Sequence, residues 1–310
     1  MRRYKVSIIG AGMVGSTTAQ CIVQKDLADV ILLDKKEEVA KGKALDIWEA
    51  SPLNGFQGVI KGTTDYTLTA YSDIAVITAG VPRKPGMTRE ELLGINGDIV
   101  VSVAKEIIKH SPEAIIIVVT NPVDALTYAA CKALDLPRTR IMGMSGMLDS
   151  SRLRSFIAME LGISPQNVTA MVIGAHTEKY MMPLLRLANI NGVPVSKLLQ
   201  KDKLEEIAKR TRLAGAEIVS LLQVGSAYYA PAMAIAEMVE AILRDERVIM
   251  PCSVCLEGEY GLNDCALCVP VILGKEGVEK IIELDLTPEE MKQMQEGAKA
   301  IKEMIGCMKI

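Results

Sequence analysis

Three residues in the second half of the chain could together move a proton and bind a carboxylate. His176 lies where an apolar strand passes into a loop, and an imidazole with a pKa near neutrality can serve a reaction that runs in both directions. Asp149 and Arg152 lie three residues apart, so that a helix places them on one face. Taken alone, a histidine in this place is more often structural than catalytic, and Asp149 with Arg152 could simply be a helix N-cap with a solvated ion pair. The other histidine, His110, ends a predicted helix, and we interpret it as a favourable charge at that terminus.

A glycine-rich sequence near the N-terminus predicts a dinucleotide site. Gly10-Ala11-Gly12-Met13-Val14-Gly15 is a G-x-G-x-x-G that follows a predicted strand and opens a predicted helix. Gly10 would make the turn, Gly12 would let a pyrophosphate approach the backbone, and Gly15 would let helix and strand pack closely. Asp34 ends the next strand, where a carboxylate bonds the ribose hydroxyls and repels a 2′-phosphate. The expected cofactor is therefore NAD rather than NADP.

The elements that position these residues alternate between strand and helix over residues 1–145. Continuous apolar runs such as 74–78 and 114–120 are typical of parallel strands that are buried on both faces. The remaining expected strands are 4–9 and 30–33, and the expected helices are 14–25, 36–49 and 89–110. This alternation predicts an α/β fold with a doubly wound parallel sheet, in a Rossmann domain that binds NAD.

Residues 146–310 are expected to form a second domain of mixed α+β structure, which binds substrate and carries the catalytic groups. No Pro- or Ser-rich linker separates the halves, so we expect them to pack as one unit. The last helix should open at Thr287, which starts a capping box. The other expected elements are a helix from about residue 149, a strand over 168–173, a long helical region over 203–244 and a hairpin of 248–256 with 265–273.

Composition excludes several classes of function. The 310 residues are 49% hydrophobic and 24% charged, with a net charge of −3 and a pI near 5.7, which gives no electrostatic reason to expect a nucleic acid or an anionic membrane as partner. No apolar run approaches the ~20 residues of a membrane span. Arg2 and Arg3 precede an apolar stretch, but glycines interrupt it and no signal-peptide cleavage site follows. Seven cysteines fit reduced thiols in the cytoplasm better than a secreted disulfide framework.

Four of the cysteines form two C-x-x-C pairs that superficially resemble a zinc ribbon. In the predicted hairpin, Cys252 should oppose Cys268 and Cys255 should oppose Cys265. Strand positions three apart face opposite sides of a sheet, so the four thiolates would not converge on one metal. We expect buried apolar thiols and no metal, with a cross-strand disulfide left open.

Several motifs, taken in order, resemble the lactate/malate dehydrogenase superfamily, and within it the lactate-dehydrogenase-like group of malate dehydrogenases. The resemblance covers essentially the whole chain. Its motifs are the glycine fingerprint, Thr78-Ala79-Gly80, Arg83-Lys84-Pro85-Gly86-Met87 with Arg89, Val119-Thr120-Asn121-Pro122-Val123-Asp124, Asp149 with Arg152, Gly174-Ala175-His176, and Gly225-Ser226-Ala227-Tyr228-Tyr229-Ala230-Pro231.

The resemblance implies a role for each site residue in NAD-dependent oxidation of malate to oxaloacetate. His176 would be the general base, Asp149 would orient it, and Arg89 would polarise the C2 oxygen. The substrate-binding residues implied are Arg83, Arg89, Asn121 and Arg152, and the cofactor-binding residues implied are Gly10 to Gly15, Asp34, Asn96, Val119, Thr120 and Asn121. It also implies a homodimer or homotetramer and a place in the tricarboxylic acid cycle.

Arg83 would decide the substrate, because an arginine at this loop position accompanies dicarboxylates in the superfamily and a glutamine accompanies lactate. We expect the loop 80–92 to close over the substrate. Against the family pattern, Thr177 replaces a glycine and Pro183 lies seven residues after His176 rather than six. The alternatives are a lactate or broader 2-hydroxy acid dehydrogenase and a non-catalytic NAD-binding homologue.

Overall fold

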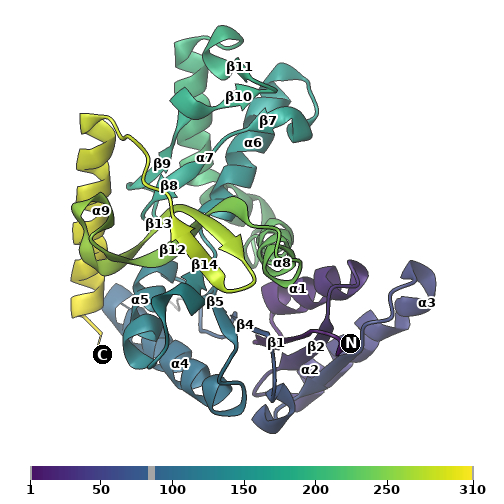
Figure 1. The fold of residues 1–310 in the computed structure, drawn as a ribbon. Helices are drawn as coiled ribbons and strands as arrows, with labels where there is room; N and C mark the ends of the chain where they lie inside the picture. Colours follow the sequence, from purple (N-terminus) through teal and green to yellow (C-terminus); the bar gives the residue numbers. More distant parts are fainter. Residues whose placement is uncertain (1, 83–87, 309–310) are drawn as a thin grey trace.

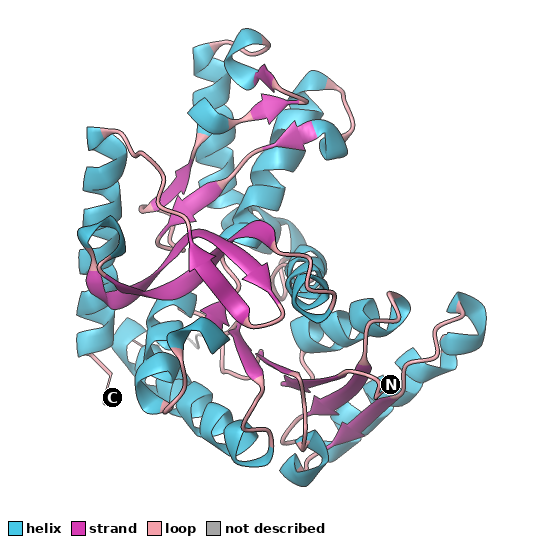
Figure 2. Ribbon diagram, in the orientation of Figure 1, coloured by secondary structure: helices cyan, strands magenta, loops and turns pink. Residues whose placement is uncertain are grey.

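One large sheet includes strands from both halves of the chain (Figure 2). The computed structural model describes residues 2–82 and 88–308, with Arg89 described by its backbone alone. Six strands in the order β3-β2-β1-β4-β5-β6 are parallel, which confirms the predicted doubly wound α/β fold. Their bounds are β1 Lys5–Ile9, β2 Asp29–Leu33, β3 Ile60–Thr63, β4 Ile74–Ile77, β5 Ile115–Val118 and β6 Ile141–Gly143.

The helices of this half connect its parallel strands. They are α1 Met13–Gln24, α2 Glu37–Glu49, α3 Ser51–Asn54, α4 Arg89–His110 and α5 Val123–Ala133. The strands β4 and β5 are buried along their whole length, as their continuous apolar sequences predict. The helix α4 begins with a capping box, in which the Thr88 hydroxyl accepts from the Glu91 N–H and the Glu91 carboxylate accepts from the Thr88 N–H.

Antiparallel strands of the second half extend the same sheet. Ser253 on β12 pairs with Gly143 on β6, so a single sheet joins the two halves and they pack as one unit. The added strands are β8 Val172–Gly174, β9 Met181–Pro183, β12 Val248–Glu257, β13 Asn263–Gly274 and β14 Gly277–Ile281. A separate small sheet contains β7 Val168–Thr169, β10 Asn189–Ile190 and β11 Val193–Pro194.

Four longer helices surround these strands (Figure 1): α6 Gly146–Leu161, α7 Lys201–Leu222, α8 Tyr229–Leu243 and α9 Pro288–Gly306. The helix α8 packs against α1 of the first half, and Lys25, which follows the last residue of α1, donates to Glu237 on α8 at 2.6 Å. The helix α9 packs against α5 and β13 and begins with the capping box predicted at Thr287. Short 3₁₀ turns complete the chain: η1 Tyr66–Thr69, η2 Arg138–Arg140, η3 Pro165–Asn167, η4 Leu185–Leu187, η5 Val195–Lys197 and η6 Glu259–Gly261.

Three sequence-based element predictions were wrong in detail. The helical region predicted over 203–244 is two helices, because Gln223 and Gly225 take the left-handed conformation, with φ of 62° and 87°. The strand predicted over 168–173 is broken into β7 and β8, which pair in different sheets. The helix α6 begins at Gly146, three residues before Asp149, so that Asp149 lies within its first turn.

The cysteine hairpin forms, but its register differs by one residue from the prediction. Cys252 pairs with Val269 and Cys255 with Ala266, rather than with Cys268 and Cys265. All seven thiols are free, and burial raises the pKa of Cys252 to about 12 and that of Cys265 to about 11. Within the described residues, no group of three or more His, Cys, Asp or Glu side chains could hold a metal ion.

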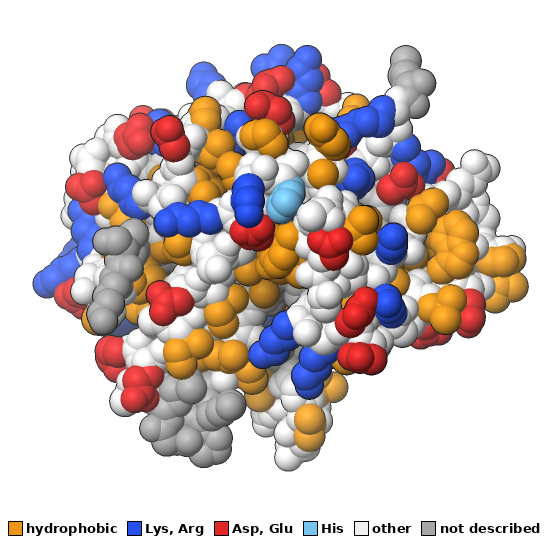
Figure 3. All heavy atoms as spheres, turned by 90° about the horizontal axis from the view of Figure 1, so that it is seen from below, with side chains coloured by type: hydrophobic (Ala, Val, Ile, Leu, Met, Phe, Trp, Pro, Cys, Tyr) orange, Lys and Arg blue, Asp and Glu red, His pale blue; other side chains and the backbone are white. Residues whose placement is uncertain are grey.

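The surface carries both signs of charge. Figure 3 shows lysine and arginine side chains interspersed with acidic ones over the face seen from below. None of the helices in residues 2–82 and 88–308 has the length and apolarity that crossing a membrane requires.

Candidate active site

The glycine fingerprint forms a tight turn between β1 and α1. Gly10 has a φ of 111°, and a Cβ atom there would lie 2.6 Å from the Thr78 hydroxyl. A Cβ at Gly15 would overlap the carbonyl oxygen of Gly10, so only glycine allows α1 to pack this closely on β1. A Cβ at Gly12 would meet no described atom within 4 Å, which leaves the approach to the N-terminus of α1 open. Such a helix N-terminus attracts a phosphate through its free N–H groups and its dipole.

Asp34 lies beside this turn, as predicted. Its carboxylate accepts hydrogen bonds from the Ala11 N–H at 2.7 Å and from the Lys36 N–H at 3.0 Å. Lys43, which the sequence did not single out, donates from α2 to the Ala11 carbonyl at 2.8 Å and to the Ser16 hydroxyl at 3.2 Å. The turn is thus held from both sides, and the acidic group at its edge suits ribose hydroxyls rather than a phosphate.

A cavity of about 520 Å³ lies at the carboxyl ends of the parallel strands. The chain reverses its strand order between β1 and β4, and ligands of doubly wound sheets bind at that point. The cavity brings together predicted residues from both halves: Val14, Asn96, Val119, Thr120, Asn121, Arg152 and His176. Residues that the sequence did not predict also line it, among them Leu148, Gly215, Val219, Ser226 and Ala227. The last two belong to the quoted motif 225–231, which was the available signal.

His176, Asp149 and Arg152 form a connected polar group at this cavity. Asp149 Oδ2 lies 2.6 Å from His176 Nδ1, and Arg152 donates to Asp149 Oδ1 at 3.1 Å. With Asp149 accepting from Nδ1–H, the other ring nitrogen of His176 is free to accept a proton. Asp149 is only 2% exposed, and the buried Nε of Arg152 has no hydrogen-bond partner among the described residues. Because Arg152 also lines the cavity, its guanidinium can bind an anion there.

The surroundings of His176 stabilise its protonated form. Burial by itself would lower the pKa of this imidazole, but the charge and hydrogen bond of Asp149, together with the charge of Asp124, outweigh it. The pKa of His176 is therefore raised above its usual value. A base with this property also serves as an acid in the reverse reaction.

Asn96 and Asn121 differ in what their side chains do. The Asn96 amide is buried and bonded to backbone: it accepts from the Val81 N–H at 2.9 Å and donates to the Asn121 carbonyl at 3.1 Å. Asn96 therefore fixes the loops that line the cavity. Asn121 is exposed at the cavity, and its Oδ1 lies 3.4 Å from the Val123 N–H. Its amide is available to a ligand.

The extra residue after His176 is absorbed in a local turn. Thr177 accepts from the N–H of Tyr180 through its hydroxyl at 3.2 Å, and from the N–H of Met181 through its carbonyl at 3.0 Å. The chain then enters β9, which pairs antiparallel with β8, beginning with Met181 opposite Gly174. The ring of His176 keeps its contact with Asp149, so the insertion does not redirect the candidate base.

Two predicted substrate-binding residues cannot be placed by contacts. Arg83 lies outside the described residues. The backbone of Arg89 begins α4, beside the cavity residue Leu92, while its side chain is not described.

Comparison with known proteins gives a consistent result over the whole chain. Residues 4–143 match the lactate/malate dehydrogenase NAD-binding domain, and residues 146–309 match the lactate/malate dehydrogenase alpha/beta C-terminal domain. A malate dehydrogenase from Desulforudis audaxviator is 52% identical over 310 residues, covering all of both chains. The crystal structure of Cryptosporidium parvum malate dehydrogenase is similar with a TM-score of 0.95 and 40% identity, covering 98% of each chain. The lactate dehydrogenase of the same organism, complexed with lactic acid and nicotinamide adenine dinucleotide, has a TM-score of 0.94 and 38% identity, covering 99% of this chain and 98% of that one.

Proposed function

Because the chain belongs to the lactate/malate dehydrogenase family, we propose that the cavity beside His176 binds NAD together with malate or oxaloacetate. The enzyme is an NAD-dependent oxidoreductase that interconverts malate and oxaloacetate. The observation that carries the assignment of residues is the 2.6 Å contact of His176 with Asp149, within a cavity that also holds Arg152.

The proton of the reaction passes through His176. Its free ring nitrogen accepts the proton of the malate C2 hydroxyl, and it returns that proton to the C2 oxygen when oxaloacetate is reduced. Asp149 keeps the Nδ1 proton in place and stabilises the imidazolium that forms. Asp149 is buried and His176 is only partly exposed, so the charge of Asp149 acts through a medium of low polarity.

The negative charge of the substrate is met by arginines. Arg152, whose Nε has no partner within the described residues, binds the C1 carboxylate with two parallel hydrogen bonds. Arg89, at the start of α4, polarises the C2 oxygen, and Asn121, which lines the cavity, donates to the same oxygen.

The residues around the fingerprint fit NAD. The open space above Gly12 and the uncapped N-terminus of α1 suit a pyrophosphate, and Asp34 suits the ribose hydroxyls. When bound, NAD supplies the hydride acceptor for malate oxidation and the hydride donor for the reverse reaction. Val119 and Thr120 would border its nicotinamide end, since both line the cavity near Asn121.

Substrate choice rests on Arg83. A dicarboxylate that is closed off from water needs a cation for its second carboxylate, whereas an unpaired buried arginine disfavours pyruvate. A lactate or broader 2-hydroxy acid dehydrogenase is the second candidate, supported by the structural similarity to the Cryptosporidium parvum lactate dehydrogenase.

The deciding experiment is the loss of NADH absorbance with oxaloacetate and with pyruvate under identical conditions. Fast turnover of oxaloacetate with little turnover of pyruvate is the expected result. A preference for pyruvate would overturn the proposed role of Arg83 but keep that of His176. Turnover of neither substrate by protein that binds NADH would favour a non-catalytic NAD-binding homologue.

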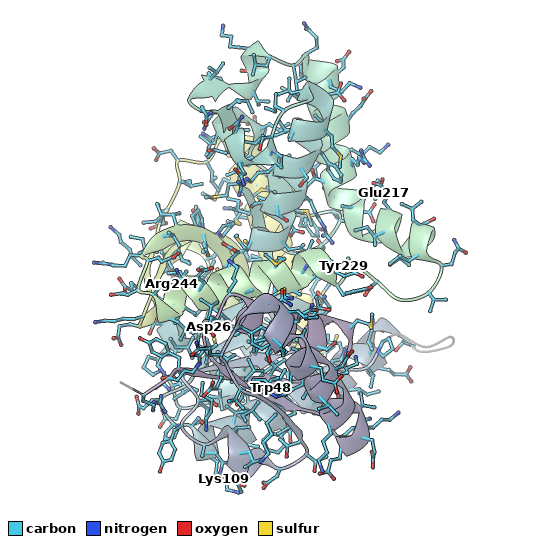
Figure 4. All side chains as sticks on the ribbon, turned by 90° about the vertical axis from the view of Figure 1, so that its right-hand side faces the viewer. Asp26, Trp48, Lys109, Glu217, Tyr229 and Arg244 are labelled. Atoms are coloured by element: carbon cyan, nitrogen blue, oxygen red, sulfur yellow. The ribbon has the colours of Figure 1, made fainter. Side chains whose placement is uncertain are left out.

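We further propose that the enzyme is a homodimer or homotetramer. Exposed apolar side chains occur on α2 and α3 and at the junction of α7 with α8, and Figure 4 shows Trp48 and Tyr229 on the same side of the molecule. These residues are Val39, Leu45, Trp48 and Leu53, and Leu221, Leu222, Val224, Tyr229 and Met233. Sedimentation of the purified protein measures the oligomeric state, and a monomer at micromolar concentration would refute this proposal. From the resemblance we also propose a cytoplasmic location and a place in the tricarboxylic acid cycle.

A further inference from the structure

A second buried carboxylate contacts the backbone of His176. Asp124 lies in the first turn of α5 and is 1% exposed. Its Oδ2 accepts from the His176 backbone N–H at 2.6 Å, and its Oδ1 accepts from the Ser253 hydroxyl at 2.6 Å. The three residues come from α5, from the loop after β8 and from β12, which are far apart in the sequence.

This arrangement fixes the main chain of His176, whereas Asp149 fixes its ring. Asp124 is also three residues after Asn121, so a single short segment carries a group that faces the substrate and a group that holds the base. A buried carboxylate costs free energy, which is acceptable only where its oxygens are well bonded. Burial raises the pKa of Asp124 to about 6, while Ser253, the charge of His176 and the His176 N–H oppose that rise.

We propose that Asp124 is a positioning residue, which holds the backbone of His176 and places a second negative charge beside its imidazole. This role rests on the proposed function of His176 as the base. Without the Asp124 charge, the imidazolium would keep only Asp149 as a counter-charge. The effect therefore reaches the reaction through the proton affinity of His176 and not through contact with substrate.

Other charged and titratable groups act on the same pair. Asp149 raises the pKa of both His176 and Asp124, and Arg152 lowers that of His176. Two thiols on β13 also lie within electrostatic reach of Asp124, namely Cys265 and Cys268, and both are neutral near pH 7 because burial raises their pKa. Of these groups, Asp149 and Asp124 are the two whose charges raise the pKa of His176.

The test is the titration of His176 in the ligand-free protein, followed by NMR of labelled histidine side chains. The chain has only two histidines, so His110 serves as an internal reference and His110→Gln assigns the signals. Asp124→Asn preserves shape: its amide oxygen can accept from the His176 N–H, and its NH₂ can donate to Ser253. We expect the His176 midpoint to fall by about one pH unit, with His110 unmoved. In the pH profile of kcat/KM for malate oxidation, the midpoint at which activity rises as His176 loses its proton should shift by the same amount.

A matched control removes a buried hydrogen bond to β8, the strand that precedes His176, without changing any charge. Ser150 accepts from the Val172 N–H at 2.9 Å, and Ser150→Ala should leave the His176 midpoint in place. An Asp124→Asn variant with an unchanged midpoint, or with activity reduced equally at every pH, would overturn the proposal and leave a structural role.

Where Asp124→Asn does not fold, Ser253→Ala replaces it. Loss of the Ser253 hydroxyl destabilises the ionised carboxylate of Asp124. The titration midpoint of His176 should therefore fall, by a smaller amount than in Asp124→Asn. An unchanged midpoint refutes the proposal. Failure of the proposed function is recognised separately, as absent turnover of oxaloacetate by the unmodified protein. The titration of ligand-free protein does not depend on that turnover.

Discussion

Replacing Asp149 by asparagine should inactivate the enzyme through the tautomer of His176. Arg152 donates to Oδ1 of Asp149, so an amide at this position would keep its oxygen toward Arg152 and turn its NH₂ toward His176 Nδ1. The ring would then carry its proton on the other nitrogen, which faces the cavity and could no longer accept one. The counter-charge of the imidazolium would be lost as well.

We expect Asp149→Asn to lower kcat/KM for malate oxidation by about 10³-fold to 10⁴-fold. The ratio corresponds to about 4–5 kcal/mol of transition-state stabilisation, the scale seen when the acid that orients a catalytic histidine is neutralised. The assay is the appearance of NADH absorbance over a range of malate concentrations. Ser150→Ala, at the adjacent buried position of α6, is the matched control and should retain activity.

The same variant also changes how stability depends on pH. His176 has a raised pKa in the folded protein, so its pairing with Asp149 stabilises the fold fully below the unfolded value of about 6.5, and this stabilisation is lost as the pH rises through the folded value. Asp149→Asn should therefore lower the free energy of unfolding, relative to the unmodified protein, by more at about pH 6 than at about pH 9. A folded variant with more than about a tenth of normal kcat/KM would refute the tautomer argument, since that loss is only about 1.4 kcal/mol.

Three further predictions concern selectivity and acid stability. Arg83→Gln should reduce the preference for oxaloacetate over pyruvate by about 10²-fold, equivalent to about 2.7 kcal/mol, and an undiminished preference in paired NADH assays would contradict it. Asp34→Ser should raise the ratio of kcat/KM with NADP to that with NAD by at least about tenfold, or about 1.4 kcal/mol; an unchanged ratio would show that Asp34 does not repel the 2′-phosphate. Arg138 holds the pKa of Glu259 at about 2, so their pairing stabilises the protein above about pH 4.5 and is lost as the pH falls toward 2. Arg138→Gln should lower the free energy of unfolding by about 1–2 kcal/mol at pH 6, a difference that denaturant titrations should find smaller at pH 3.

The division of roles between the two halves explains why the site lies where they meet. The parallel sheet supplies the fingerprint turn and Asn121, while α6 and the loop after β8 supply Asp149, Arg152 and His176. The β6–β12 pairing joins the two parts of the sheet from which these groups project, and Asp124 adds a direct hydrogen bond across the same boundary. The proposed roles of these residues in substrate binding and proton transfer therefore depend on contacts between distant parts of the chain.

The sequence by itself determined the parallel sheet and the fingerprint turn, and it singled out the residues that we propose to react. Apolar runs such as 74–78 are typical of strands buried on both faces, and the tight turn that requires glycine at Gly10 and Gly15 lies within one short segment. Such features depend mainly on residues that are close in the sequence, so the order of residue types along the chain predicts them. His176 and Asp149 were found because the motifs around them match a known family in order and spacing.

Tertiary structure decided the features that depend on partners distant in sequence. The one-residue difference in the cysteine hairpin arises from strand register, which pairing across β12 and β13 sets and alternating sequence does not. The break between α7 and α8 depends on two left-handed residues within an otherwise helical pattern. Asp124 belongs to a motif that the sequence made visible, but its role beside His176 appears only when α5 meets the loop after β8, because a hydrogen bond across 52 residues leaves no trace in local spacing.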